Sequence, residues 1–371
     1  MSDLKESNGG NWFDGIVKDR RRILLDVALA PLQGDRFQPT GFADLGAAVY
    51  TLPDGTRKIL VESAQSMANR LEAALLEDRD LKPAFKGLSY VRVFPDKETT
   101  MFTNSLIEPH RLNSPWILGG TVKGREKLFR GTLREAMEGV KRGDGTKGDV
   151  PKPALMDQKR IADAIFRYDA NALLHGIFLV GIESRIRMPR ALTAFIEATN
   201  VREAHSGGTK LDPVDPTGKW TAEKTEKADV YGNVPFHRLE YTAERITAFF
   251  NLDLDLLRGF GLPECAFDLL VNLAFYKIRF FLENGLRLRT ACDLRMTEEI
   301  AVREPKELVI PSLIDLEKNV VEKIKGCSEN GLFAASPTDV ETMTKKAKAK
   351  AAAAEGEETD DQETDNDDEE Q

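Results

Sequence analysis

RITAFFNLDLDLLRGFGLPECAFDLLVNLAFYKIRFFLENGLRLRTACDL, residues 245–294, is the stretch that decides the fold, because its hydrophobic period changes twice. Apolar and polar residues alternate over 246–254, which predicts a strand with one buried face. From Pro263 the apolar residues recur every three or four positions, the stripe of an amphipathic helix that Asn284 and Gly285 should end. Alternation returns at 286–294. The segment therefore predicts a strand, a helix and a second strand.

Similar patterns continue outward toward the N-terminus. Alternation over 23–29 predicts a strand, and apolar stripes after Glu62 and over 157–168 predict two helices. Residues 173–180 and 191–198 are expected to be strands. The order of these elements is close to the β-α-β-β-α-β plan, so we expect an α+β fold: a modified ferredoxin-like or RRM-like domain with large insertions.

Three boundaries divide the chain. Residues 1–17 are polar and are expected to be a flexible N-terminus, and the domain proper is expected to span 18–335. Residues 202–235 carry glycines, prolines and charges without a sustained period, which predicts a long loop, functional or disordered, inserted in the domain. Residues 336–371, acidic from Glu355 onward, cannot bury apolar surface and are expected to be a disordered tail.

Composition limits the class of protein. The formal net charge is −9, but eleven acidic residues fall within 355–371, so residues 1–354 are close to neutral and RNA binding would need a local basic face. The start has no signal-peptide pattern, and no apolar run is long enough to span a membrane. The three cysteines lie far apart, which fits a reducing cytoplasm and gives no zinc spacing. We expect no metal and no cofactor.

Catalytic candidates are few. The four histidines are scattered without ligand spacing, and His175 is expected to be a core residue. His205, His237, Asp212 and Asp215 lie in or beside the 202–235 insertion, where acid–base or metal-assisted RNA cleavage is conceivable. The sequence supplies no motif for it. We therefore expect no catalytic residues.

Basic residues give a stronger signal. Arg185, Arg187 and Arg190 precede one predicted strand, and Arg287 and Arg289 lie on one side of the last strand. Guanidinium groups match phosphate oxygens with a planar fork of donors, so both runs are candidate phosphate contacts. A solvated sheet face with ion pairs to Glu183 or Asp293 explains them equally well.

A polar cluster forms the second candidate. Ser63, Ser66 and Arg70 follow one another at helical spacing from the first turn of the predicted helix. Hydroxyl and backbone N–H groups at a helix N-terminus favour an anion, so a phosphate is expected there. Ordinary helix capping is the alternative.

Six long blocks in matching order resemble one protein family. That family is the RAMP-superfamily backbone subunit of the type I-G (formerly I-U) CRISPR Cascade complex, the seventh Cas family. The resemblance covers roughly residues 20–300 and departs from the family pattern at Asp35, where a serine is commoner. The matching blocks are GDRFQPTGFADLGAA (34–48), VESAQSMANRLE (61–72), EPHRLNSPWI (108–117), RMPRALTAFIEATNVREAHSGG (187–208), GNVPFHRLEYTAERITAFFNLDLDLL (232–257) and GLRLRTACDL (285–294).

The resemblance implies a hand-shaped RNA-recognition fold with palm, fingers and thumb, the 202–235 insertion being the candidate thumb. Such proteins stack head-to-tail on the CRISPR guide RNA, which pairs with target DNA, and the helicase-nuclease is a separate recruited protein. Implied partners are therefore guide RNA, target DNA through the guide, copies of itself, other Cascade subunits and the helicase-nuclease, with no membrane. Candidate RNA-binding residues are Gln33, Arg36, Gln38, Ser63, Ser66, Arg70, Arg185, Arg187, Arg190, Phe236, Arg287 and Arg289.

Several alternatives stay open. Phe37 or Phe236 is the candidate wedge at a kink in the guide, with a core role favoured for Phe37. His110, Arg111 and Asn113 fall in a matching block, but a structural loop explains them as well. Other RAMP proteins are endoribonucleases that process CRISPR RNA or cleave target RNA, and a purely protein-binding subunit is a further alternative.

Overall fold

The structure is a computed structural model that describes residues 11–42, 44–95, 99–138, 157–182, 186–218 and 232–342. Its centre is an eight-stranded antiparallel sheet. In spatial order the strands are β17 (Arg287–Arg289), β18 (Cys292–Met296), β1 (Arg22–Pro31), β16 (Arg245–Asp253), β13 (Leu192–Thr199), β5 (Arg57–Glu62) and β4 (Val49–Thr51), with β19 (Ala301–Glu304) also paired to β1.

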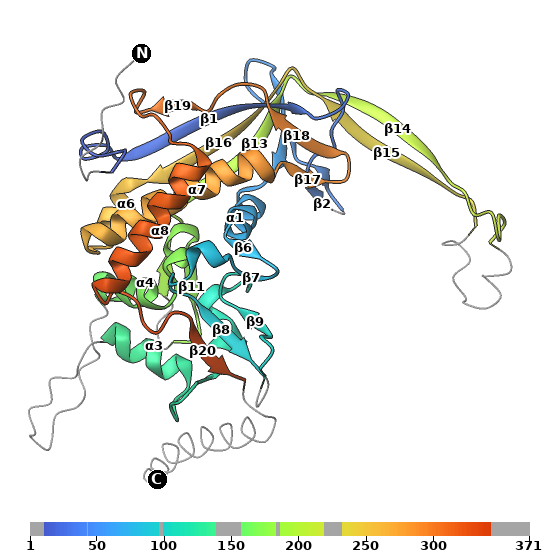
Figure 1. Cartoon of the computed structure of the whole chain (residues 1–371). Coiled ribbons are helices and arrows are strands. Elements are labelled where there is room, and N and C mark those ends of the chain that lie inside the picture. The colour runs from blue at the N-terminus through green and yellow to red at the C-terminus, as the bar shows by residue number, and fades with distance from the viewer. Residues whose placement is uncertain are drawn as a thin grey trace, which may run out of the picture.

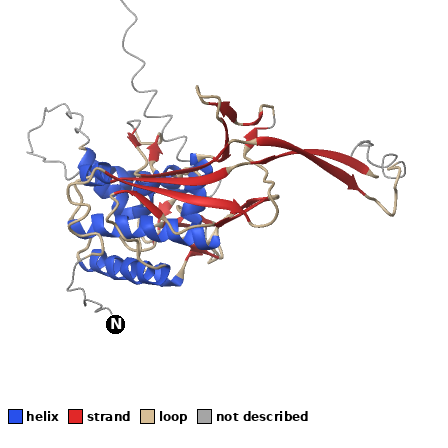
Figure 2. Ribbon diagram, turned by 90° about the horizontal axis from the view of Figure 1, so that it is seen from above, coloured by secondary structure: helices blue, strands red, loops and turns tan. Residues whose placement is uncertain are grey.

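Long helices lie against one face of this sheet (Figure 1). They are α1 (Ala64–Ala73), α4 (Gln158–His175), α7 (Glu264–Asn284) and α8 (Leu313–Glu329). The odd-numbered residues of β1, from Ile23 to Leu29, are buried toward the helices and the even-numbered ones are not, which is the expected period of two. Seen from above, the strands lie over the helices (Figure 2), and in the described part of the chain no helix covers the opposite face.

The order β1, α4, β13, β16, α7, β18 confirms the α+β class and the ferredoxin-like plan. The strands of this unit stand in the spatial order β18-β1-β16-β13, so the last and the first strand are neighbours. The short helix α6 (Leu254–Gly259) joins β16 to α7, and the side chain of Asp253 caps it. Helix α7 ends at Gly285, as its sequence predicted.

A smaller lobe lies below the sheet in Figure 1. It holds a four-stranded sheet made of β10 (Thr121–Val122), β20 (Thr338–Glu341), β8 (Val91–Phe94) and β9 (Thr103–Asn104). The sequence analysis missed this sheet because its strands are short and come from distant segments. Around it lie β6 (Leu76–Glu77), β7 (Asp80–Leu81), η1 (Pro83–Phe85), η2 (Arg111–Asn113), α2 (Pro115–Leu118), α3 (Phe129–Glu138), β11 (Ile177–Leu179) and β12 (Ile186–Met188).

The insertion predicted as a loop at 202–235 is in fact a β-hairpin arm in its described part. Strands β14 (Arg202–Lys210) and β15 (Val234–Thr242) pair antiparallel over nine residue pairs and project from the body (Figures 1 and 2). Most of β14 is exposed on both faces, so no buried face exists to impose an alternation on the sequence. The prediction of an irregular loop was therefore wrong for 202–210 and 234–235.

Two other boundaries are corrected. Residues 173–175 end helix α4, so the strand predicted at 173–180 is confined to β11. Strand β20 pairs in parallel with β8 at 338–341, inside the segment assigned to the tail from 336. The acidic block from Glu355 lies outside the described residues. Among the described residues, no helix combines the length and the apolar character needed to cross a lipid bilayer.

The N-terminal segment is also corrected, because residues 11–17 pack on α7. Phe13 is 1% exposed and Val17 is buried. The Trp12 Nε1 donates to the Asn272 Oδ1 at 2.9 Å, and the Trp12 ring meets Phe275 edge-on. The pair buries aromatic surface, which the polar composition of the N-terminus did not predict.

Replacing Phe13 with alanine should lower the free energy of unfolding by about 3 kcal/mol, since it empties a buried aromatic site. Denaturant unfolding of the two proteins measures the difference. Lys18→Ala, an exposed change in the same segment, serves as the control. Equal stability of the Phe13 variant and the wild type would support the original prediction of a flexible N-terminus.

Candidate nucleic-acid interface

The loop after β1 is fixed to the base of the arm. Phe37 is fully buried, and its backbone N–H and carbonyl both bond Tyr241 of β15, at 2.9 and 3.0 Å. A backbone bridge of this kind sets the position of every residue from Gln33 to Thr40 relative to the arm. The core role expected for Phe37 is confirmed, and it cannot be the wedge.

A groove with a volume of about 710 Å³ opens at this junction; we call it the arm-base groove. The described residues that line it include no aspartate or glutamate. Phe42 is exposed on it and Arg238 is partly exposed, and Gln38, another lining residue, has a buried Oε1 without a partner. Its lining is Gln38, Pro39, Thr40, Gly41, Phe42, Gly46, Ala47, His237, Arg238, Leu239, Tyr241, Arg289 and Thr290.

Two arginines are held beside the groove by one carboxylate. Glu240 on β15 is buried, and its oxygens lie 3.1 Å from Arg36 Nη1 and 3.8 Å from Arg238 Nη1. Both arginine side chains stay more than a third exposed, at 54% and 39%. Their remaining donors can therefore meet a polyanion in solvent. Gln33, also predicted, is exposed in the same loop.

A second carboxylate pairs with two of the predicted arginines, whose side chains are 25% and 24% exposed. Glu62, buried at the end of β5, pairs with Arg289 Nη2 and, at 3.6 Å, with Arg70 Nε. Arg289 Nη1 also donates to the carbonyls of Gln38 and Val61, each at 3.0 Å. Arg70 donates to the carbonyls of Arg287 and Leu288.

These contacts give Arg70 and Arg289 a structural role. Their guanidinium donors bond internal oxygens, so the two residues position the loop and β17, and their contact with phosphate stays a prediction. Arg287, one position before Leu288, is different. Its side chain is 85% exposed and lies 3.7 Å from the Asp293 carboxylate, so it is accessible as predicted.

The serines of α1 form a helix cap. The Ser63 Oγ accepts the backbone N–H of Ser66 at 3.3 Å, which satisfies one of the free donors of the first turn. Capping was the alternative to a phosphate site at this helix end. A phosphate at Ser63 and Ser66 stays a prediction.

The remaining predicted residues lie apart. Phe236 is 48% exposed on the arm, with Arg238 5.9 Å above its ring and Gly208 opposite. Arg187 and Arg190 line a different cleft, which opens beside η2 and the β11–β12 hairpin. Arg185 lies outside the described residues. The structure thus gathers Gln33, Arg36, Gln38 and Arg289 at the arm base and leaves Arg187 and Arg190 in the second cleft.

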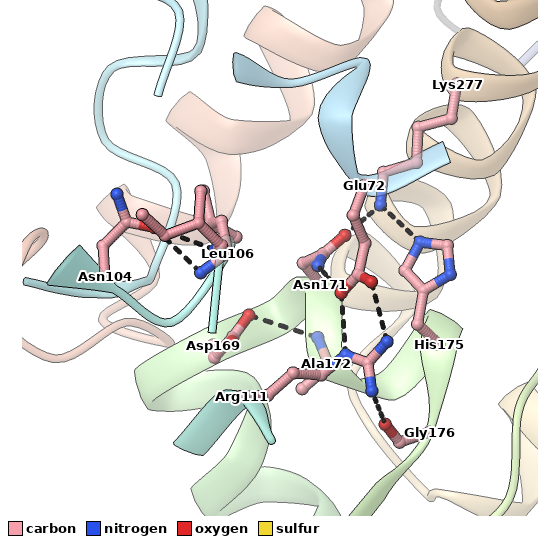
Figure 3. A network of polar contacts seen from close by, with 11 residues as sticks. Glu72, Asn104, Leu106, Arg111, Asp169, Asn171, Ala172, His175, Gly176 and Lys277 are labelled. Carbon is pink, nitrogen blue, oxygen red and sulfur yellow. Dashed lines mark hydrogen bonds and ion pairs between the residues drawn. The ribbon is translucent and has the colours of Figure 1, made fainter. Parts of the chain in front are cut away.

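That second cleft has a buried polar network behind it (Figure 3). Glu72 of α1 accepts two hydrogen bonds from Arg111, both 2.7 Å, and Arg111 Nη1 donates to the Gly176 carbonyl at 2.9 Å. Lys277 of α7 donates to Asn171, and its Nζ lies 2.9 Å from His175 Nε2. The network joins η2, α1, α4 and α7. It gives Arg111 the structural role that the sequence had left as one alternative.

Burial sets the protonation of this network. Desolvation lowers the pKa of Lys277 to about 7 and holds that of His175 well below its usual value, while it raises the pKa of Asp169 to about 7. Each shift favours the neutral form of a fully buried group. Asp169 interrupts α4 with φ −159° and caps the following turn by accepting the Ala172 N–H at 3.1 Å.

Raising the pH from 7 to 9 should stabilise the wild type relative to Lys277→Met. The pKa of Lys277 is below its unfolded value, so the unfolded chain binds more protons in this range and stability rises with pH, by up to about 1.4 kcal/mol per unit. Unfolding of both proteins at each pH measures the change. A pH-independent difference, equal to that of the exposed control Lys325→Met, would contradict it.

The catalytic candidates form two pairs on the arm, one of histidines and one of aspartates. His205 Nδ1 and His237 Nε2 lie 3.1 Å apart across the arm. Asp212, at its tip, accepts the backbone N–H groups of Val214 and Asp215, which lowers its pKa. No group of three potential metal-binding side chains occurs in the part of the chain that the structure describes.

Sequence reasoning missed Arg238. This residue precedes the buried Glu240 by two positions, so it does not stand out before the fold is known. The signal that identifies it is the 39% exposure of its side chain in the folded chain.

Comparison with known proteins gives one family match. Residues 23–203 match the family model described as CRISPR-associated protein GSU0053. No curated protein matches the chain. One similar solved chain belongs to a "CRISPR RNA-guided surveillance complex, pre-nicking", with 13% identity, a TM-score of 0.37 and 74% of each chain covered.

Proposed function

We propose that this protein is a non-catalytic RNA-binding backbone subunit of a Cascade-type CRISPR complex, several copies of which line up along the guide RNA. The observation that carries the proposal is the match of residues 23–203 to a CRISPR-associated family. The accessible arginines around the arm base support it, because they suit a phosphate backbone.

The grip on RNA follows from those side chains. Arg36, Arg238 and Arg287 present guanidinium groups around a loop that is fixed to β15. Such contacts neutralise phosphates and do not read bases, which suits a subunit that must accept any guide sequence. Phe236 and Phe42 add exposed aromatic faces on which a base can stack.

The arm supports a repeated assembly. Its nine-residue strands reach about 30 Å at 3.4 Å per residue, and its outer part buries little within its own chain. In our proposal the arm meets the guide and a neighbouring copy, a heterologous contact that propagates until the RNA ends. Target DNA would then pair with the guide, and the other Cascade subunits and a helicase-nuclease would be separate chains.

Substituting Arg238 and Arg287 with alanine should weaken binding of a labelled repeat–spacer RNA and flatten its salt dependence. The log–log slope should fall by about 0.7 for each phosphate of a single strand that the variant no longer neutralises. Fluorescence anisotropy from low to moderate salt measures affinity and slope. Lys325→Ala removes one exposed charge from α8 and should change neither. Unaltered binding by the double variant would contradict the proposal that RNA binds at the arm base.

The number of copies bound should increase stepwise with the length of the guide, and the RNA should stay intact. Native mass spectrometry of complexes with guides of increasing length counts the copies, and denaturing gels of the same mixtures, with and without magnesium, report cleavage. Site-specific cleavage that is abolished by His205→Ala or Asp212→Ala would replace the scaffold with an endoribonuclease. A copy number that does not change with the length of the guide would contradict the proposed assembly of several copies along the RNA.

A further inference from the structure

The second cleft, which we call the finger cleft, is a cavity of about 600 Å³ between η2, the end of α4 and the β11–β12 hairpin. Its volume suits a small organic ligand rather than a bare ion. Its lining is Pro109, His110, Arg111, Asn113, His175, Gly176, Ile177, Phe178, Val180, Arg187, Met188, Pro189 and Arg190, none of them acidic.

The charge of the finger cleft is not cancelled within the described residues. Arg111 is neutralised by the Glu72 carboxylate, but neither Arg187 nor Arg190 has an ion pair with a carboxylate in the described part of the chain. Arg190 uses Nη1 on the Ala64 carbonyl at 3.2 Å and keeps its other donors. Burial, and next the charge of Arg111, lowers the pKa of Arg190, a cost that a bound anion would offset.

His175 places an unpaired ring nitrogen at the wall of the finger cleft. The residue is 1% exposed, and Lys277 Nζ lies 2.9 Å from its Nε2. The other ring nitrogen, Nδ1, is buried without a partner and turns away from Lys277 (Figure 3). Buried polar atoms without a partner are rare, so this one indicates a missing hydrogen-bonding group.

An aromatic face completes the finger cleft. Phe178 is 40% exposed, and the Arg187 guanidinium lies 4.6 Å from its ring centroid. Gly176 keeps the floor open: its φ is +76°, and a Cβ there would come within 2.9 Å of the Met188 carbonyl and 3.0 Å of the Arg190 side chain. A stacking face next to two cations is the combination that a nucleotide requires.

We propose that the finger cleft binds one nucleotide of the RNA strand, in an arrangement separate from the arm-base groove. The phosphate lies against Arg187 and Arg190, the base stacks on Phe178, and a polar group of the nucleotide forms a hydrogen bond with His175 Nδ1. This proposal rests on the proposed function, since the strand that supplies the nucleotide is the RNA held at the arm base.

The test compares an intact RNA with the same RNA carrying abasic positions, each binding to the wild type, Phe178→Ala and Arg187→Glu. Phe178→Ala should weaken binding of the intact RNA about tenfold, the effect of removing one base stack, and leave binding of the abasic RNA unchanged. Arg187→Glu should weaken both RNAs and reduce the salt dependence. Phe195→Ala, which removes an exposed phenylalanine of β13, is the control and should alter neither.

The outcomes separate the two proposals. If the wild type binds no RNA, the proposed function itself is contradicted. Wild-type binding that is weakened by the Arg238 and Arg287 substitutions but not by Phe178→Ala or Arg187→Glu overturns the finger cleft and leaves the arm base. Equal weakening of intact and abasic RNA by Phe178→Ala, at unchanged thermal stability, overturns the stacked base. Because Phe178 and Arg187 are both exposed, neither substitution opens a core.

Discussion

The buried carboxylate of Glu62 holds the interface together. It stands where β5 ends and α1 begins, accepts a hydrogen bond from Arg289 of β17 and forms an ion pair with Arg70 of α1. Those two side chains in turn bond carbonyls of the loop after β1 and of β17 itself. Removing one partner of such a buried pair costs about 3–5 kcal/mol, because the remaining charge stays desolvated. One carboxylate therefore joins the β5–α1 junction to two segments that are distant from each other in sequence, the loop after β1 and β17.

This explains how much of the site the sequence could predict. The residue type was predictable: arginines at 287 and 289 alternate with buried leucines, so both were expected on one side of a strand, and both are. Their roles were not predictable, because the carboxylate that pairs with Arg289 lies 227 positions away. A sequence with no alignment gives no contact between residues so far apart. Arg287 is paired instead with Asp293, a carboxylate that is itself 44% exposed, and the Arg287 side chain stays largely exposed.

The fold, too, has parts that the sequence could predict and parts that it could not. Strands β1, β13 and β16 and helix α7 each bury one face, and burial imposes the period that the sequence displays. The arm buries no continuous face, so its strands left no period to detect. Strand β20 is four residues long and pairs with β8, which lies almost 250 positions earlier. Short strands with distant partners carry too little pattern to be found.

The charge distribution reconciles an acidic chain with a polyanionic ligand. The net charge of −9 is dominated by the block from Glu355, and within the described residues the two clefts are lined without a carboxylate. Where a carboxylate does approach, at Glu240 or Glu62, it is buried and orients arginines. Local potential depends on charges within about a Debye length, roughly 8 Å at physiological salt. A basic surface can thus exist on a chain whose overall charge is negative, and in the proposed function the orientation of a few guanidinium groups decides where the RNA strand lies.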